Sequence, residues 1–303
     1  VLVLTRTGQV WKGRPGQLKR QTHITFTGTR PLLARWFTYA REKGCVTPEW
    51  SINGFVTPQD CPPENEMRTH LLLVSTDDDQ THPQTFFQLL DRQGRQVWHL
   101  RLRDVRANLV LTSVSVQGEF QVMATAGSLP GSPTLGKHDV ILLKVSPIER
   151  TSEVLLRVGS EAEDEATLFG FNADLEMVVG GQTNGAVTGR YGGRGDAFLT
   201  QWRSGRDWTL QLGGAQAERF DDLFLTGSFY SPMQGFIFGR VDEHPAIWTF
   251  KDGTGHFTRV PLPENYPMQE LKFFRLFKEN ALLIVGKRSG KTSWTLFPLN
   301  SRN

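Results

Sequence analysis

The chain has 303 residues, of which 38% are hydrophobic and 21% charged, and its 34 Lys and Arg residues slightly outnumber its 31 Asp and Glu residues. This composition is typical of a globular protein with a large hydrophobic core, and it excludes an intrinsically disordered chain. No apolar run approaches the roughly 18–20 residues that a membrane-spanning helix needs, so we expect no membrane span.

Segments with alternating apolar and polar residues recur along the chain, as half-buried antiparallel strands require. They lie at Val1–Thr5, Leu33–Tyr39, Phe86–Leu90, Asp139–Val145, Gly195–Trp202, Ala246–Phe250 and Ser293–Leu299. The steps between the internal ones, counted from Leu33, Phe86, Asp139, Asp196, Ala246 and Ser293, are 53, 53, 57, 50 and 47 residues. One four-stranded propeller blade needs roughly 40–50 residues before insertions. The spacing therefore predicts an all-β β-propeller, with residues 1–303 as one domain and these segments as first strands of its blades.

One sequence pattern runs twice between His138 and Arg240. The second copy carries Gly195-Asp196-Ala197-Phe198, then Leu212-Gly213-Gly214, then Asp221-Asp222, and the first copy, from His138-Asp139, follows it loosely. These residues resemble the SBBP-type β-propeller repeat, which has a G-x-D-A-F strand and a later L-G-G followed by paired acidic residues. The resemblance implies a propeller with a scaffold role, and it brings no catalytic residues.

The two ends of the chain hold too few residues for a blade each. Residues 1–32 are short for a full blade, and the last strand, Ser293–Leu299, cannot build one alone. We therefore expect the N- and C-terminal strands to share one blade, which would close the ring and remove an exposed sheet edge. This predicts six blades, or seven if residues 40–75 contain an extra hairpin.

An irregular insertion at about residues 41–65 contains both cysteines, Cys45 and Cys61. In an oxidising compartment a disulfide between them would stabilise the fold by about 3 kcal/mol, and two unpaired thiols are the alternative. Position 1 is Val, and the chain has no Asn-x-Ser/Thr glycosylation sequon. We expect an exported bacterial protein, periplasmic, extracellular or on the cell surface, whose signal peptide has been removed.

Several motifs have structural interpretations. Arg194-Gly195-Asp196 spells an adhesion tripeptide but falls where the repeat itself requires Gly and Asp. Gly286–Thr292 lacks one residue of a phosphate-binding loop and continues as a strand.

The seven histidines show no metal-binding spacing, so no metal ligand and no cofactor is predicted. Calcium is the alternative to solvated charge for three acidic clusters, at residues 77–79, 161–165 and 221–222.

Charge is unevenly distributed along the chain. Residues 1–45 carry a net charge of +8 and residues 286–303 of +4, whereas residues 153–176 carry −6. If the ends meet, the two basic segments form a basic closure sector that would attract an anionic partner. The candidate partner-binding residues are Lys12, Arg14, Lys19, Arg20, Lys43, Lys287, Arg288 and Lys291, together with the tryptophans Trp36 and Trp50.

We expect a non-catalytic binding or assembly module of the bacterial cell envelope, which engages a protein partner, a larger envelope assembly or an anionic ligand. No recognised nucleic-acid-binding module is present, so nucleic acid is not an expected partner. The alternative is a propeller enzyme of the glycosidase or lyase type, with its site at the mouth of the central channel. An enzyme should gather carboxylate, His or Tyr side chains around the channel, whereas a scaffold should fill it with small or apolar ones.

Overall fold

The computed structural model describes part of the chain, and every structural statement below concerns these residues. They are residues 2–4, 9–12, 19–23, 27–40, 45–48, 68–77, 79, 82–91, 94–111, 119–171, 177–202, 208–228, 231–242, 244–251, 257–260, 270–276, 281–288 and 291–298.

The described residues form 23 β-strands in six antiparallel sheets, and they contain no helix. The first sheet contains β1 (Leu2–Leu4), β2 (Gln9–Lys12) and β3 (Lys19–His23). The second contains β4 (Arg30–Ala40), β5 (Cys45–Pro48), β6 (Arg68–Asp77), β7 (Gln84–Leu90) and β8 (Gln96–Arg103), in the order β5-β4-β6-β7-β8. The third contains β9 (Val105–Leu111), β10 (Phe120–Ala126), β11 (Asp139–Ser146) and β12 (Thr151–Val158).

The last three sheets repeat the same up-and-down order. The fourth contains β13 (Asp164–Phe171), β14 (Met177–Thr183), β15 (Asp196–Trp202) and β16 (Trp208–Leu212). The fifth contains β17 (Glu218–Ser228), β18 (Ser231–Val241), β19 (His244–Lys251) and β20 (Phe257–Val260). The sixth contains β21 (Glu270–Leu276), β22 (Ala281–Arg288) and β23 (Lys291–Pro298).

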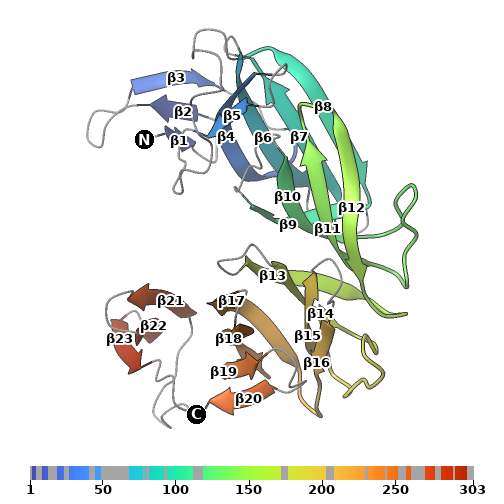
Figure 1. The fold of residues 1–303 in the computed structure, drawn as a ribbon, viewed down its shortest axis with the longest axis vertical. Helices are drawn as coiled ribbons and strands as arrows, with labels where there is room; N and C mark the ends of the chain where they lie inside the picture. Colours follow the sequence, from blue (N-terminus) through green and yellow to red (C-terminus); the bar gives the residue numbers. More distant parts are fainter. Residues whose placement is uncertain are drawn as a thin grey trace.

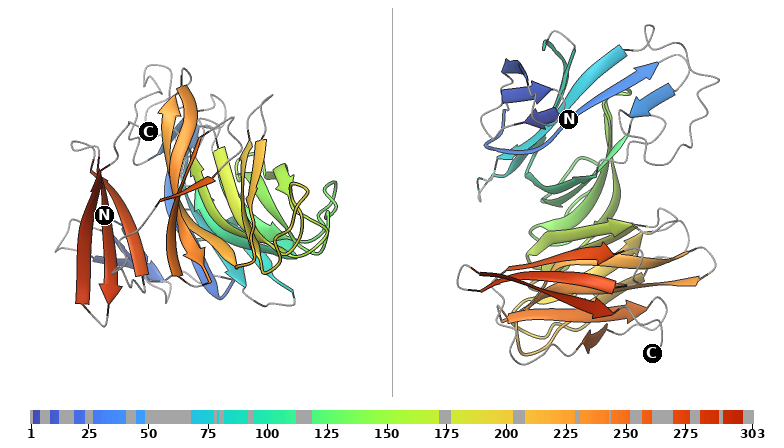
Figure 2. Two further views of the ribbon diagram at one scale, coloured as in Figure 1. Left: turned by 90° about the horizontal axis from the view of Figure 1, so that it is seen from below. Right: turned by 90° about the vertical axis from the view of Figure 1, so that its left-hand side faces the viewer.

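The six sheets follow one another around an arc, which is the arrangement of propeller blades (Figure 1). The first strands β4, β9, β13 and β17 lie on the inner side of the arc, and the fourth strands β8, β12 and β16 on its outer side. Figure 2 shows the same sheets from two other directions. The predicted all-β propeller class is confirmed, and β5 joins the second sheet beside β4.

The predicted shared blade is not confirmed, because among the described strands each end of the chain forms a sheet of its own. β1 pairs with β2, with Leu2 opposite Lys12, and β23 pairs with β22, with Ala281 opposite Pro298. No described strand pairing joins the two terminal sheets, which lie on the two sides of the opening of the arc (Figure 1). Residues 2–23 already contain three short strands, so local hairpins pair their backbone groups without the far end of the chain.

The regular sequence spacing has a structural basis that differs from the predicted one. The segments from Phe86, Asp139, Asp196, Ala246 and Ser293 fall in β7, β11, β15, β19 and β23, each of which is the third up-and-down strand of its blade. These five segments are therefore not first strands, whereas Leu33 lies in β4, the first up-and-down strand of the second sheet. Third strands such as β11 pair on both sides and carry mostly buried residues, which explains their strong apolar signal.

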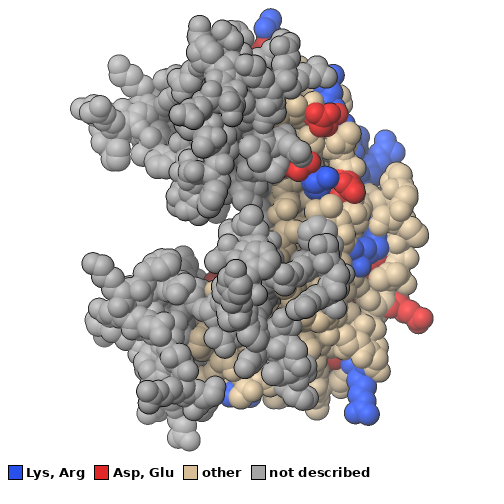
Figure 3. Space-filling model, viewed as in Figure 1, with Lys and Arg blue, Asp and Glu red and all other residues tan. Residues whose placement is uncertain are grey.

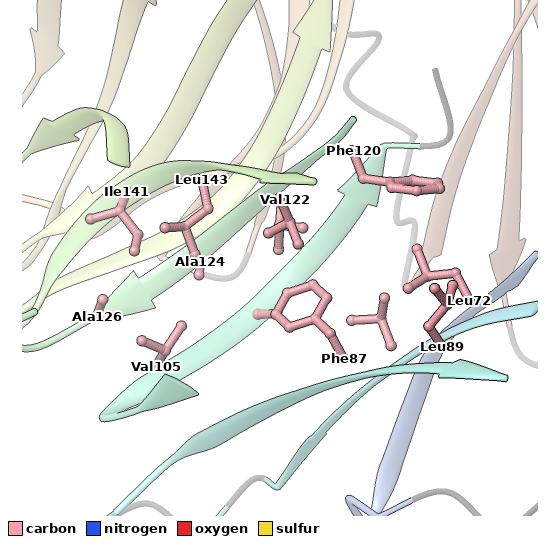
Figure 4. Close-up of a cluster of buried hydrophobic side chains, with 13 residues drawn as sticks. Leu72, Phe87, Leu89, Val105, Phe120, Val122, Ala124, Ala126, Ile141 and Leu143 are labelled. Carbon is pink, nitrogen blue, oxygen red and sulfur yellow. The ribbon is translucent and has the colours of Figure 1, made fainter. Parts of the chain in front are cut away.

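The core fills the spaces between neighbouring sheets. Between the second and third sheets, Phe87, Phe120, Val122 and Leu143 belong to one buried cluster (Figure 4). A second cluster, which includes Phe198, joins the third sheet to the fourth, and a third, which includes Phe220 and Trp248, joins the fourth to the fifth. This packing fixes the first strands of adjacent blades side by side.

Candidate functional site

The strand order brings acidic residues to one end of the sheets. Successive strands alternate in direction, so the first and third strands of every blade start at the same end. Asp164 and Glu218 begin the first strands β13 and β17, and Asp139 and Asp196 begin the third strands β11 and β15. All four carboxylates are buried.

His138 lies at this end, between two carboxylates of the third and fourth blades. Its Nε2 atom is 3.1 Å from Asp104 Oδ1, and its Nδ1 atom is 2.9 Å from Glu163 Oε1. The exposed fractions of the three side chains are 23% for His138, 44% for Asp104 and 46% for Glu163. The imidazole is therefore held in place and still reachable from solvent. Its Nε2 atom makes a hydrogen bond with Asp104, whereas the buried Nδ1 atom lies close to Glu163 without forming a hydrogen bond to any described residue. An imidazole that faces two carboxylates in this way is a candidate for proton transfer.

The backbone around His138 is closely constrained. Asp164 N donates to His138 O at 2.9 Å, which joins β11 to the start of β13. Asp104 sits in the β8–β9 turn with a φ of 57°, and its carbonyl accepts a hydrogen bond from Gly127 N at 2.8 Å. A Cβ atom on Gly127 would collide with the Asp104 carboxylate, so only glycine leaves room for that side chain.

Behind His138, Asp139 and Arg157 form a buried ion pair. Arg157 Nη1 is 2.6 Å from Asp139 Oδ2, and the side chains are 8% and 0% exposed. The guanidinium also donates to Ser132 Oγ at 2.8 Å and to Gly127 O at 2.9 Å. Arg157 therefore neutralises Asp139 and holds the loop between β10 and β11, which leads into His138.

The adjacent Asp164 carboxylate is tied to the loop before β13. Ser160 donates to it through its backbone N at 2.6 Å and through its Oγ at 3.1 Å. Burial raises the pKa of Asp164, the hydroxyl of Thr183 and the donors of Ser160 lower it, and the Asp139 charge adds to the rise. A Cβ atom on Gly159 would lie 2.4 Å from Asp139 Oδ1 and 2.7 Å from Asp164 Oδ2, so this glycine separates the two acids.

The junction between the fourth and fifth blades repeats this arrangement with different partners. Gln211 Nε2 donates to Asp196 Oδ2 at 2.7 Å, and Gly192 N donates to the same oxygen at 2.9 Å. Burial, with repulsion from Asp196 and Asp242, raises the pKa of Glu218 to about 7. A carboxyl group that keeps its proton near neutral pH is a marker of functional sites, although buried structural acids show it too.

The inner strands carry charged pairs. Arg106 of β9 and Glu165 of β13 lie 2.9 Å apart, two residues beyond Asp104 and Glu163 on the same strands. On β17, Asp221 accepts from Arg219 Nε at 2.9 Å and from Arg240 Nε at 3.1 Å. Charged side chains therefore occur on the inner strands β9, β13 and β17.

These ion pairs also account for two of the three acidic clusters that had calcium as an alternative. Glu163 and Glu165 face His138 and Arg106, and Asp221 faces two arginines. In the third cluster, Asp77 Oδ1 accepts from Thr29 Oγ1 at 3.2 Å. Within the described ranges, no group of three or more His, Cys, Asp or Glu residues is placed to hold a metal ion.

The described part of the chain contains no helix that could span a membrane.

The adhesion interpretation of Arg194-Gly195-Asp196 is excluded by burial. Asp196 is 0% exposed, and its carboxylate is bound by Gln211 and Gly192. Gly195 has a φ of 111°, which other residues rarely adopt. The tripeptide is therefore a structural element of the repeat, as the sequence analysis predicted.

The structure brings the predicted partner-binding residues together only in part. The β2–β3 hairpin places Lys12 opposite Lys19 and Trp11 opposite Arg20, and the β22–β23 hairpin places Arg288 opposite Lys291. Lys287 lies opposite Thr292, and Trp36 of β4 opposite Leu71. The basic closure sector is not built from one blade, since its two halves lie in separate sheets. Figure 3 shows acidic and basic side chains interspersed on the described part of one face.

Other predicted residues lie outside the described part of the chain. These are Arg14, Lys43, Trp50 and Cys61. Cys45 begins β5, and its disulfide with Cys61 stays a prediction.

Sequence reasoning missed the group formed by His138, Asp104 and Glu163. The two acids lie 34 and 25 residues from the histidine, so no short motif links them. The only sequence signal was the position of His138 directly before Asp139, where the repeat begins. Its partners follow from the way adjacent blades meet.

No protein-family model matches the sequence, and the comparison with curated proteins finds no match. Among solved structures, a variant of the Synechocystis apocarotenoid oxygenase is 11% identical, with a TM-score of 0.45 over 99% of this chain and 67% of that one. An ACO/RPE65 chimera is 10% identical, with a TM-score of 0.44 over the same shares. The polysaccharide lyase Uly1 is 12% identical, with a TM-score of 0.43 over 84% of this chain and 65% of its own. The chain thus spans about two thirds of the length of these structures.

The oxygenase and the lyase are enzymes by name, so these structures do not support the expectation of a non-catalytic binding or assembly module, although with TM-scores below 0.5 they assign no activity to this chain. The charged residues on the inner strands also differ from the small or apolar residues that were expected of a scaffold. At 10% to 12% identity the comparison assigns no substrate to this chain. None of these matches bears on the SBBP-type resemblance, which stays a prediction.

Proposed function

We propose that this chain is a β-propeller enzyme of the glycosidase or lyase type that cleaves a polysaccharide, with its active site around His138 at the end of the inner strands β9 and β13. The observation that carries the proposal is the partly exposed imidazole held between Asp104 and Glu163. The expected exported location would bring it to polysaccharides of the cell envelope or the medium.

Both reaction types need a positioned group that moves a proton. In a hydrolase, an acid protonates the glycosidic oxygen while a carboxylate acts from the other side of the sugar ring. In a lyase, a base removes the proton next to the carboxylate of a uronic acid, the C–O bond breaks, and the leaving oxygen takes a proton. His138 can supply the proton transfer in either case, and Asp104 and Glu163 orient the imidazole ring. Arg106, two residues beyond Asp104 in the chain, is an inner-strand cation that could bind an acidic sugar, although it is paired with Glu165 in the structure.

The test is a cleavage assay on neutral and uronic-acid polysaccharides with the wild-type protein and His138→Gln. New reducing ends alone indicate hydrolysis, and reducing ends with the ultraviolet absorbance of unsaturated uronic acids indicate a lyase. We expect His138→Gln to lose activity by roughly 10²–10⁴-fold, the usual contribution of general acid–base catalysis.

The matched control is His99→Gln, because His99 is exposed on the outer strand β8. This variant should keep full activity. Equal activity of His138→Gln and wild type, or no cleavage of any polysaccharide tested, would reject the proposal.

A further inference from the structure

Two neighbouring blade junctions can be compared position by position, because the strand registers align them. Asp139 and Asp196 begin the third strands β11 and β15 and therefore correspond to each other. Two residues after Asp139, β11 lies opposite Arg157. Two residues after Asp196, β15 lies opposite Gln211. Asp164 and Glu218 correspond in the same way, because Asp164 lies five residues after Gly159 and Glu218 lies five residues after Gly213. Each acid begins the first strand of its blade and is paired with a residue of the second strand, Asp164 with Thr183 and Glu218 with Val241.

The two junctions share their backbone donors. Each aspartate accepts a hydrogen bond at 2.9 Å from the backbone N of the residue four positions before it. Leu135 N donates to Asp139 Oδ2, and Gly192 N donates to Asp196 Oδ2. Ser160 N donates to Asp164, and Gly214 N to Glu218. The loops are therefore held in equivalent ways.

The side chains that stabilise negative charge differ. At the first junction the Arg157 guanidinium and the hydroxyls of Ser160 and Thr183 surround the two acids. At the second junction the corresponding residues are Gln211, Gly214 and Val241. A neutral amide has replaced the cation, and neither hydroxyl is present. Counted over the two acids and the residue that contacts the aspartate, the formal charge is −1 at the first junction and −2 at the second.

Unpartnered oxygens mark the second junction. Glu218 Oε2 and Asp196 Oδ1 are buried and accept no hydrogen bond, and the two side chains are 7% and 0% exposed. Asp139 Oδ1 is also unpartnered, but its carboxylate has Arg157 on the other oxygen. Leaving buried carboxylate oxygens without a donor or a cation is costly.

Among the described residues, the other charged groups near this junction do not supply the missing cation. Asp242, in the β18–β19 turn, adds a further negative charge that acts on Glu218. Arg194 and His244 act on Asp242, and both lie at exposed positions. Arg219, the residue after Glu218, is exposed and pairs with Asp221.

We infer that the junction between Asp196 and Glu218 binds a divalent cation of the calcium type, which supplies the positive charge that the Arg157 guanidinium supplies at the equivalent junction. Asp196 Oδ1 and Glu218 Oε2 are the free protein oxygens. Calcium binds roughly six to eight carboxylate, carbonyl and water oxygens, so carbonyl or water oxygens would have to complete the site that these two carboxylates begin. A divalent ion also balances the two negative charges.

The experiment measures the thermal unfolding midpoint of EDTA-treated full-length protein at pH 8, with EDTA retained, with CaCl2 and with MgCl2. We expect CaCl2 to raise the midpoint by roughly 3–8 °C when it is well above the dissociation constant. Glu218→Gln removes one ligand charge and should abolish this rise. Glu149→Gln, in an exposed turn, is the matched control and should retain it.

Two exchanges of residues between the junctions sharpen the test. Gln211→Arg supplies the cation from the chain, so its midpoint should no longer respond to CaCl2. Arg157→Gln should create a second calcium-responsive junction and enlarge the response. Because Gln211 Oε1 also accepts from the backbone N of Val187 and Thr188, Gln211→Arg could fail to fold. The test then depends on Glu218→Gln.

Either of two results overturns the inference. One is an unchanged wild-type midpoint in CaCl2 and MgCl2 at pH 8, which would mean that the junction binds neither ion. The other is a rise that Glu218→Gln retains in full, which would place the bound ion elsewhere.

Discussion

Arg157 and Asp139 form an ion pair inside the protein, with Nη1 and Oδ2 2.6 Å apart and the side chains 8% and 0% exposed. The pair joins the fourth and third strands of one blade at the end where His138 lies. One blade further, the same positions hold Gln211 and Asp196. One blade earlier they hold Arg101 and Gln84, whose Nε and Oε1 are 2.6 Å apart. The contact thus recurs in three successive blades, and its net charge changes from one to the next.

The first prediction concerns this ion pair. Arg157→Gln should lower the free energy of unfolding by about 3–5 kcal/mol, because it leaves Asp139 and Asp164 buried together without a cation. Denaturant unfolding measures the change. Arg95→Gln is the control, because Arg95 pairs with Asp91 while 77% exposed, and it should cost less than about 1 kcal/mol. Similar effects for both variants would contradict the assigned role of Arg157.

The second prediction concerns pH. The pKa of Glu218 is about 7 in the folded protein, above its ordinary value of 4.5. Between these values the folded chain holds a proton that the unfolded chain has released, so stability falls as pH rises from about 4.5 to about 7. The full loss, present above pH 7, is about 3 kcal/mol. Asp164, whose pKa is also raised, acts in the same direction.

Glu218→Gln isolates this effect. In unfolding measurements from pH 5 to pH 8, in EDTA, the variant should be more stable than wild type at pH 8 and should lose most of that advantage by pH 5. A difference between the two proteins that does not depend on pH would show that Glu218 does not titrate in this window.

The fold was largely predictable from the sequence because third strands dominate its apolar pattern. Strands such as β11 and β15 pair on both sides, so their residues are buried and their spacing equals one blade. The first strands lie at the inner edge and carry charged residues such as Arg106 and Glu165, which weakens their signal. The predicted ring closure is not confirmed, and pairing between the chain ends cannot be read from local spacing.

The candidate site was less predictable. Asp196 was recognised as a structural residue of the repeat because it has a fixed place beside Gly195. His138, Asp104 and Glu163 come from a strand start and two inter-blade connections, and only the docking of adjacent blades brings them together. The sequence alone also does not show that Arg157 and Gln211 occupy equivalent positions, because this equivalence follows from the strand registers.

The third prediction concerns the core between the third and fourth blades. Phe198 of β15 is fully buried and belongs to the cluster that joins these sheets. Phe198→Ala should cost about 3–5 kcal/mol of stability through lost apolar burial and the cavity it leaves. Val97→Ala is the control, because Val97 is 38% exposed, and it should change stability by less than about 0.5 kcal/mol. Comparable losses would mean that the two sheets do not pack as described.

The last prediction uses two adjacent glycines at the second junction. A Cβ atom on Gly213 would lie 2.0 Å from Asp196 Oδ2, whereas one on Gly214 would lie 3.1 Å from Glu218 Oε1, at the end of a longer and more adaptable side chain. Gly213→Ala should therefore displace the Asp196 carboxylate from Gln211 and Gly192 and cost about 2–4 kcal/mol. Gly214→Ala, the matched control, should cost less than about 1 kcal/mol, because the Glu218 side chain can move by the few tenths of an ångström required. Denaturant unfolding of both variants at pH 8 decides the matter, since an equal cost would show that the Asp196 carboxylate does not occupy the space that Gly213 leaves open.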